Sequence, residues 1–173
     1  NKFNVNVPGK QSKWMFLPDL GRDEGCMGIY PVTAPSETTQ TAPRLEYKVF
    51  VNKQGKSTIC LGILPTQDVN PERGLRIAVS IDNGEPQILD ARKGLVDTFT
   101  EYTPNNLANS KVLKPLPPLN KDIALVGTGK MRRNEIFDNL RWLDVQLDVA
   151  ASGFHTLKVY MIDPEVVLEK IVV

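Results

Sequence analysis

Apolar and polar residues alternate with a period of two along several stretches of this sequence, and this pattern constrains the fold most strongly. Alternation puts successive side chains on opposite faces of an extended chain, so it is typical of strands that cover a core with one face. In RLEYKVFV (44–51), the expected core face carries Leu45, Tyr47, Val49 and Val51. In LRWLDVQLDV (140–149), it carries Leu143, Val145, Leu147 and Val149. The sequence therefore predicts half-buried strands in both segments.

Turn signals lie between the predicted strands. NKQG follows 44–51 and leads into KSTICLGILP, which we expect to pair with 44–51 as a hairpin. Asn83-Gly84 follows the alternating segment 74–81, and an Asn-Gly pair accepts positive φ at little cost, so PQILD is expected to return as its partner. The closing segment, GFHTLKVYMIDPEVVLEKIVV, predicts a strand, a turn and a final strand that pairs with the first.

The remaining segments contain little regular pattern. From Ala91 to Leu119 the sequence has no period and contains several prolines, which predicts a long proline-rich loop. KMRRNEIFDNL, from Lys130 to Leu140, predicts one short helix. Many short strands without crossover helices predict an all-β fold, an antiparallel β-sandwich. A length of 173 residues suits a single domain over 1–173.

Composition narrows the classes of partner. A formal charge of +1 gives no long-range attraction to nucleic acid or to an anionic membrane, and no segment has the roughly 18 apolar residues of a membrane span. Cys26 and Cys60 could form at most one disulfide and lie in no metal-binding spacing. The start, NKFNVNVPGKQSKW, has no initiating Met and no signal-peptide pattern, so we expect a mature product or a piece of a longer polypeptide.

His155 is the only histidine, and it shares a strand face with Leu157, Val159 and Met161. That face is expected to point into the sandwich, so we expect His155 to be structural, with a backbone carbonyl as partner. A catalytic triad that contains histidine would have to use His155, and a single histidine cannot form a multi-histidine metal site. ALVGTGKM resembles a phosphate loop but has Met131 where Ser or Thr is needed. We therefore expect no catalytic residue, no metal and no cofactor.

Aromatic residues provide the candidates for a sugar site. Trp142 is expected on the outer face of its strand beside Asp144, and sugar rings stack on such aromatic faces while carboxylates bind their hydroxyls. The alternative is that the proline-rich loop or another domain covers Trp142. Trp14 and Arg22 lie in another candidate segment, KWMFLPDLGRDEG, where Trp14 is either a sugar contact or a core residue.

A series of motifs in fixed order resembles one known family. The motifs are WxxLPDLGR at 14–22, PxTAPS at 31–36, PRLEY at 43–47, GLRIAVSIDNGEPQ at 74–87, DNLR at 138–141 and GFHTLKVYMIDPEVVLEKIV at 153–172. Together they resemble the C-terminal domain of glycoside hydrolase family 115, the xylan α-glucuronidases. The chain departs from that pattern at its start, where the given sequence begins after an Ile-Glu-Ala strand of the family pattern, so that we expect this edge strand to be lost or replaced. It also departs at Glu165, where glycine is common.

The resemblance implies a jelly-roll β-sandwich, similar to carbohydrate-binding modules, in a larger enzyme that releases (4-O-methyl-)glucuronic acid from glucuronoxylan. It implies an upstream catalytic domain as partner, a homodimer, and an extracytoplasmic location, either periplasmic or secreted. Asp163 and Pro164 belong to the resembling motif and, like His155, are expected to be structural.

Three hypotheses stay open. The first is an accessory domain with an apolar patch near Trp142 or the loop, the second an autonomous module that binds xylan-type glycans, and the third a small enzyme built around His155.

Overall fold

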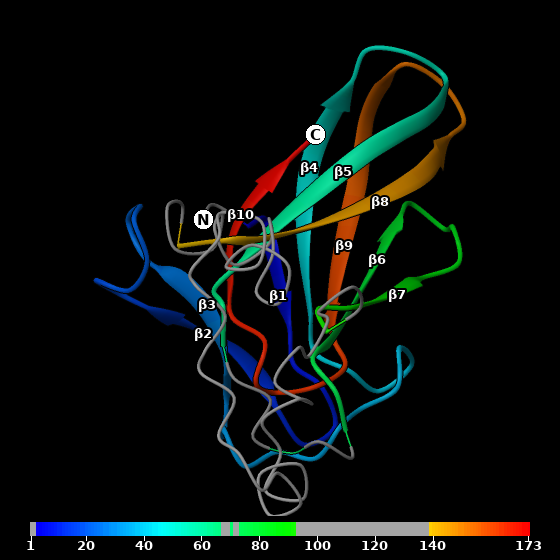
Figure 1. The fold of residues 1–173 in the computed structure, drawn as a ribbon. Helices are drawn as coiled ribbons and strands as arrows, with labels where there is room; N and C mark the ends of the chain where they lie inside the picture. The colour runs from blue at the N-terminus through cyan, green and yellow to red at the C-terminus, as the bar shows by residue number, and fades with distance from the viewer. Residues whose placement is uncertain (1–2, 67–69, 71–72, 93–138) are drawn as a thin grey trace, which may run out of the picture. The chain divides into compact units, whose positions relative to one another are not determined.

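The described residues form two antiparallel β-sheets without a helix (Figure 1). The computed structural model describes residues 3–66, 70, 73–92 and 139–173. Sheet A has the order β1 (Val5–Val7), β4 (Arg44–Val51), β9 (Gly153–Met161), β6 (Arg76–Ile81) and β7 (Gln87–Asp90). Sheet B has the order β2 (Lys13–Leu17), β3 (Cys26–Tyr30), β10 (Leu168–Val172), β5 (Gly55–Ile63) and β8 (Arg141–Val149). The predicted all-β antiparallel sandwich is therefore confirmed.

The connections between strands differ from the predicted hairpins. From β3 onward, consecutive strands lie in opposite sheets except for β6 and β7, as in a jelly roll. The β6–β7 hairpin is confirmed, with Val79 opposite Gln87. The predicted pairing of β4 with β5 is wrong, and so is that of β9 with β10. In both cases the turn crosses between the sheets, because two strands with one apolar face each can bury both faces by facing one another across a core.

The core between the sheets follows the alternation. All four predicted positions of β8 are buried, and on β4 Leu45 and Val51 are buried while Tyr47 and Val49 pack partly buried against them. On β9 the same row is formed by Leu157, Val159 and Met161. In the long β4–β9 pairing, Leu45 lies opposite Val159 and Tyr47 opposite Leu157. A shift by one residue would expose both rows, so the apolar pattern sets the register.

The N-terminal strands were not predicted. β1 pairs with the start of β4, with Val5 opposite Glu46, and forms one edge of sheet A. β2 and β3 pair along their full length, with Trp14 opposite Ile29. Neither strand alternates cleanly in burial, which explains why periodicity alone did not reveal them.

Two predicted features fall largely outside the described residues. Of the predicted loop, Ala91 and Arg92 are described; Ala91 is buried, and its N–H donates to the Leu75 carbonyl at 2.8 Å. Of the predicted helix, Asn139 and Leu140 are described and are not helical; Asn139 has a φ of 53° just before β8. The rest of both features, and the single-domain prediction for 1–173, stay predictions.

Candidate functional site

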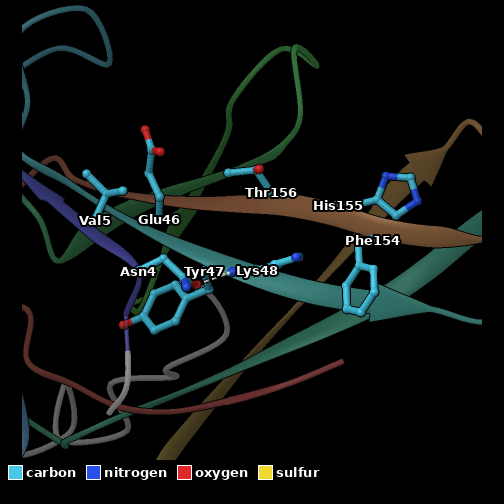
Figure 2. Close-up of a pocket in the computed structure, with 8 residues that line it drawn as sticks. All are labelled: Asn4, Val5, Glu46, Tyr47, Lys48, Phe154, His155 and Thr156. Carbon is cyan, nitrogen blue, oxygen red and sulfur yellow. Dashed lines mark hydrogen bonds between the residues drawn. The ribbon is translucent and has the colours of Figure 1, made fainter.

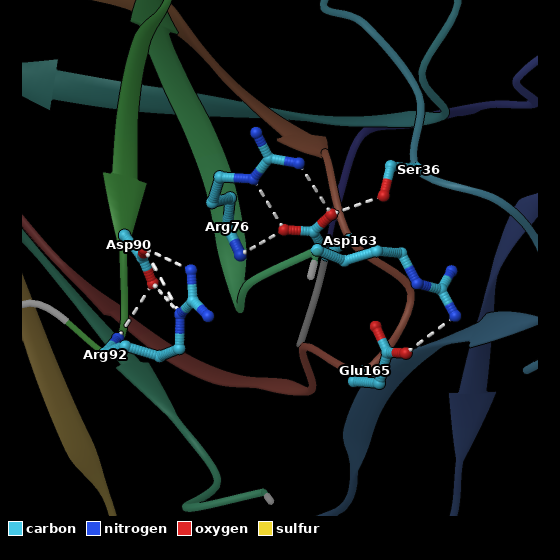
Figure 3. A network of polar contacts seen from close by, with 7 residues as sticks. Ser36, Arg76, Asp90, Arg92, Asp163 and Glu165 are labelled. Carbon is cyan, nitrogen blue, oxygen red and sulfur yellow. Dashed lines mark hydrogen bonds and ion pairs between the residues drawn. The ribbon is translucent and has the colours of Figure 1, made fainter. Parts of the chain in front are cut away.

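A buried carboxylate joins three segments at the end of β9 (Figure 3). Asp163 is 0% exposed and accepts hydrogen bonds from Arg76 Nε at 2.8 Å and Arg76 Nη2 at 3.0 Å. It also accepts from the Arg76 main-chain N–H at 2.9 Å and from Ser36 Oγ–H at 2.6 Å. The hydrogen bond to Asp163 raises the pKa of the Arg76 guanidinium. Both carboxylate oxygens of Asp163 accept hydrogen bonds from the domain itself, so Asp163 connects these segments of the fold. The neighbouring Pro164 is buried.

A second aspartate, Asp82, lies at the other end of the antiparallel pair formed by β6 and β9. Asp82 follows β6 with a φ of 49°, and its Oδ1 accepts the Thr156 N–H at 2.9 Å. Its Oδ2 lies 2.7 Å from His155 Nδ1, and His155 Nε2 lies 2.9 Å from the Ala151 carbonyl oxygen. The His155 partners thus include the backbone carbonyl expected from the sequence. Among the described residues, neither hydrogen bond of the imidazole goes to a cysteine or serine side chain.

Trp142 packs on its own sheet. It lies opposite Gly62 of β5, and a Cβ at position 62 would lie 3.1 Å from Trp142 Cζ3. The indole therefore covers the glycine, as aromatic residues cover strand glycines elsewhere. Trp142 is half-buried against a cluster on the outer face of sheet B that contains Cys26, Leu64 and Leu140. The ring face toward Gly62 is occupied, which reduces the surface available to a sugar.

Asp144 shares the outward face of β8 with Trp142, whereas Trp14 lies in the core. Trp14 is 2% exposed, and its Nε1–H donates to the Pro43 carbonyl at 3.1 Å, so it is a core residue and offers no face to a sugar. It also lies on β2, at the opposite edge of sheet B from β8. Arg22 is exposed in the β2–β3 connection, where its main-chain N–H donates to Glu169 Oε1 at 2.9 Å. Asp144 is exposed on β8 opposite Cys60.

The cysteines do not provide a nucleophile. Both are free thiols, so the disulfide that the sequence left open is not formed. Burial, together with the neighbouring Glu169 carboxylate, raises the pKa of the Cys26 thiol to about 11. Burial also raises the pKa of Cys60, as does its hydrogen bond to Asp144. Both groups are thiols at neutral pH, and the thiolate is the reactive form.

A groove of about 310 Å³ lies beside β1, β4 and β9 of sheet A (Figure 2). Phe154, which is 66% exposed, lies at one side of it, and Lys48 Nζ is 4.4 Å from the centre of its ring. The Phe154 ring also meets Phe50 edge to face at 5.1 Å. The sequence interpretation did not single out this site, although Phe50 and Phe154 occupy outward positions in the alternating pattern. The other residues lining the groove are Asn4, Val5, Glu46, Tyr47, His155 and Thr156.

A larger groove, of about 520 Å³, lies beside β2 and β3 of sheet B. Met15, Leu17 and Val32 form apolar walls, and Arg73 pairs with Glu165 at 3.1 Å in its lining. Three exposed large apolar residues lie on the groove side of these strands or directly after β3, and we call them the β2–β3 apolar surface: Met15, Tyr30 and Val32. Phe16 is exposed too but projects from the opposite face of β2, and Leu20 lies in the β2–β3 connection. The apolar patch that the sequence predicts near Trp142 or the proline-rich loop stays a prediction, because most of that loop lies outside the described residues.

Among residues 3–92 and 139–173, as far as they are described, no group of three or more His, Cys, Asp or Glu side chains could hold a metal ion. In the same part of the chain, no helix has the length and apolarity to span a bilayer.

Comparisons with known proteins add to this geometry. No curated protein has significant sequence similarity to the chain. Among solved structures, a family GH115 4-O-methyl-α-glucuronidase with specificity for decorated arabinogalactans matches 99% of this chain with a TM-score of 0.58 and 16% identity. The match spans only 17% of that enzyme, and at this identity it shows the fold alone.

Two carbohydrate-binding modules match with lower scores. The C-terminal CBM6 of a laminarinase from Zobellia galactanivorans has a TM-score of 0.47 and 11% identity over 96% of this chain and 95% of its own. A module from Cellvibrio mixtus lichenase 5A, in complex with cellotriose, has a TM-score of 0.44 and 10% identity over 98% of this chain and 95% of its own. The sequence model of the glycosyl hydrolase family 115 C-terminal domain matches residues 1–105 and 128–173, and the chain therefore belongs to that family.

Proposed function

We propose that this chain is a non-catalytic accessory domain of a larger family 115 glycoside hydrolase, and that it packs against the rest of that polypeptide. The observation that carries the proposal is the family match over most of the chain, together with a solved relative of which the chain spans 17%. The parent reaction that we propose is release of (4-O-methyl-)glucuronic acid from glucuronoxylan. A polymer of that kind is met outside the cell, so we also propose a periplasmic or secreted location.

The β2–β3 apolar surface is the proposed contact with the upstream catalytic region. Neighbouring exposed apolar side chains on a folded domain are typical of protein–protein contacts. Val32 is 73% exposed, and its removal from water on docking would be favourable by about 1.5–3 kcal/mol at full burial. The adjoining groove with its Arg73–Glu165 pair could accept a projecting side chain of the partner.

Association between two separately produced parts of the parent enzyme tests this contact. The chain is mixed with the upstream region, and binding is measured by calorimetry. We expect Val32→Asp to weaken binding at least tenfold, because a charge would be buried, whereas the matched control Ile88→Asp should bind as the wild type does. Ile88 is 56% exposed but lies on β7 of sheet A. Equal binding of both variants would contradict the proposed surface, and glucuronidase activity of the chain alone would contradict the accessory role.

Dimerisation of the parent enzyme, which the family resemblance implies, is a separate part of the proposal. Light scattering on the assembled protein and on the chain alone measures whether the chain contributes to it. A dimer that persists in parent enzyme lacking this domain would remove dimerisation from its role.

A second candidate function, binding of xylan-type glycans, is favoured by the sheet A groove. Phe154 offers an exposed ring, and the polar side chains of Asn4 and Thr156 line the same groove. Calorimetric titration with xylan and aldouronic oligosaccharides tests it. Binding that is lost in Phe154→Ala but retained in Ile88→Ala would support a carbohydrate-binding module. Absence of binding by the wild type would rule out glycan binding as a function of this chain.

A further inference from the structure

His155 lies between two groups that only accept hydrogen bonds. Nδ1 faces the Asp82 carboxylate at 2.7 Å, and Nε2 faces the Ala151 carbonyl oxygen at 2.9 Å. A neutral imidazole carries a proton on one nitrogen only, so it can donate to just one of these partners. The imidazolium ion carries both protons and satisfies both. We propose that His155 is a charged clasp that joins the β6–β7 turn to the β8–β9 turn and opens when its proton is lost.

The surroundings favour the charged form. The hydrogen bond to Asp82 raises the pKa of His155, and the carbonyl of Ala151 adds to this effect. Burial alone would raise the pKa of the Asp82 carboxyl. The hydrogen bonds from the Thr156 N–H and from His155 outweigh burial, so the pKa of Asp82 is lowered and Asp82 is ionised at neutral pH.

The other charged groups nearby do not reverse this preference. Lys158 Nζ donates to the Asp82 carbonyl oxygen at 2.6 Å and belongs to β9 itself. On β4, the neighbouring strand in the same sheet, Lys48 lies over the Phe154 ring. Glu46 in the same groove is paired with Arg44 at 2.7 Å. The titratable Tyr47 also lines that groove, and burial raises the pKa of its phenol, so it is neutral there.

Loss of the proton affects the two ends of the clasp differently. The remaining proton stays on Nδ1, because a hydrogen bond to a carboxylate is stronger than one to a carbonyl. Nε2 and the Ala151 oxygen then face each other as two acceptors and repel. The β8–β9 turn is therefore released, whereas the β6–β7 turn remains attached through Asp82 and the Thr156 N–H. Because His155 lines the sheet A groove, opening changes the border of that groove.

The single histidine makes the test direct. Nitrogen-15 spectra that correlate ring nitrogens with ring protons show the charge and tautomer of His155 without interference from another imidazole. Between about pH 5 and pH 9, we expect both nitrogens to be protonated at the acidic end. The midpoint should lie above the ordinary value of about 6.5, with the proton on Nδ1 beyond it. The amide signals of Ala151, Ser152 and Gly153 should shift with the same midpoint.

Variants separate the clasp from a histidine that merely fills space. Asp82→Asn keeps a residue that tolerates positive φ, and it should lower the midpoint of His155. Asp90→Asn, an aspartate at the other end of the β6–β7 pair, should leave that midpoint unchanged. In His155→Gln, the turn amides should no longer shift near neutral pH. A neutral imidazole at pH 6, a midpoint unaffected by Asp82→Asn, or turn amides that shift equally in His155→Gln would each overturn the proposal.

Discussion

Replacing Asp163 by Asn provides the sharpest test of what holds the sandwich together. The carboxylate is fully buried and accepts four hydrogen bonds from Arg76 and Ser36. An amide of the same shape keeps the packing but removes the charge and turns one acceptor into a donor that points at another donor. Breaking a buried pair costs about 3–5 kcal/mol, and we expect about 3 kcal/mol because Arg76 is 35% exposed and water can reach it.

The matched control is a pair of the same chemistry at the surface. Asp90 is 30% exposed and lies 3.2 Å from Arg92, so Asp90→Asn should cost less than about 1 kcal/mol. For a domain of this size, about 3 kcal/mol corresponds to a fall in Tm of roughly 6–12 °C, against a few degrees at most for the control. Urea and thermal unfolding followed by circular dichroism measure both. If Asp163→Asn were no more destabilised than Asp90→Asn, the reasoning from burial would be refuted.

Three further predictions concern the core and the clasp. Gly62→Ala should destabilise the fold by about 1 kcal/mol and shift the fluorescence of Trp142, because a Cβ would lie 3.1 Å from that ring; an unchanged spectrum would contradict the packing. Trp14→Phe should cost about 1 kcal/mol in urea unfolding, since it removes one of the two hydrogen bonds to the buried Pro43 carbonyl and leaves the one from the Met161 N–H; a neutral effect would count against the Trp14 hydrogen bond. The pKa of His155 is raised in the folded state, so its stabilisation is complete below about pH 6.5 and is lost as pH rises through the folded pKa; His155→Gln should lack this slope.

The long strands could be predicted because one face of each meets the core. In β8 every second residue is buried, so the sequence pattern and the burial pattern coincide. In β3 four consecutive residues are buried, since a cluster on the outer face of sheet B covers Cys26 while the core covers Met27. Burial on both faces removes the alternation, and the strand then cannot be recognised from its period.

The partners of single side chains depended on contacts that sequence spacing does not reveal. Trp14 and Trp142 were both candidates for a sugar contact, and Trp14 could also be a core residue. In the structure Trp14 inserts into the core beside Pro43, and Trp142 covers Gly62. Asp163 was expected to be structural from the family resemblance alone, and its partner Arg76 lies 87 positions earlier. Sheet assignment had the same difficulty, because the turn after β4 contains nothing that distinguishes a hairpin from a crossing between sheets.

The polar anchors and the apolar surface occupy different parts of the fold, and this separates stability from binding. β6 and β9 run antiparallel, so an aspartate after each strand reaches the start of the other: Asp163 binds Arg76, and Asp82 binds His155 and Thr156. Both ends of the central pair in sheet A are thereby fixed from within the domain. The exposed apolar side chains on β2 and β3 lie in the other sheet and expose apolar area to water. Because burial of exposed apolar area favours association, the contact proposed above lies at the β2–β3 apolar surface, and the β6–β9 anchors keep their partners within the domain.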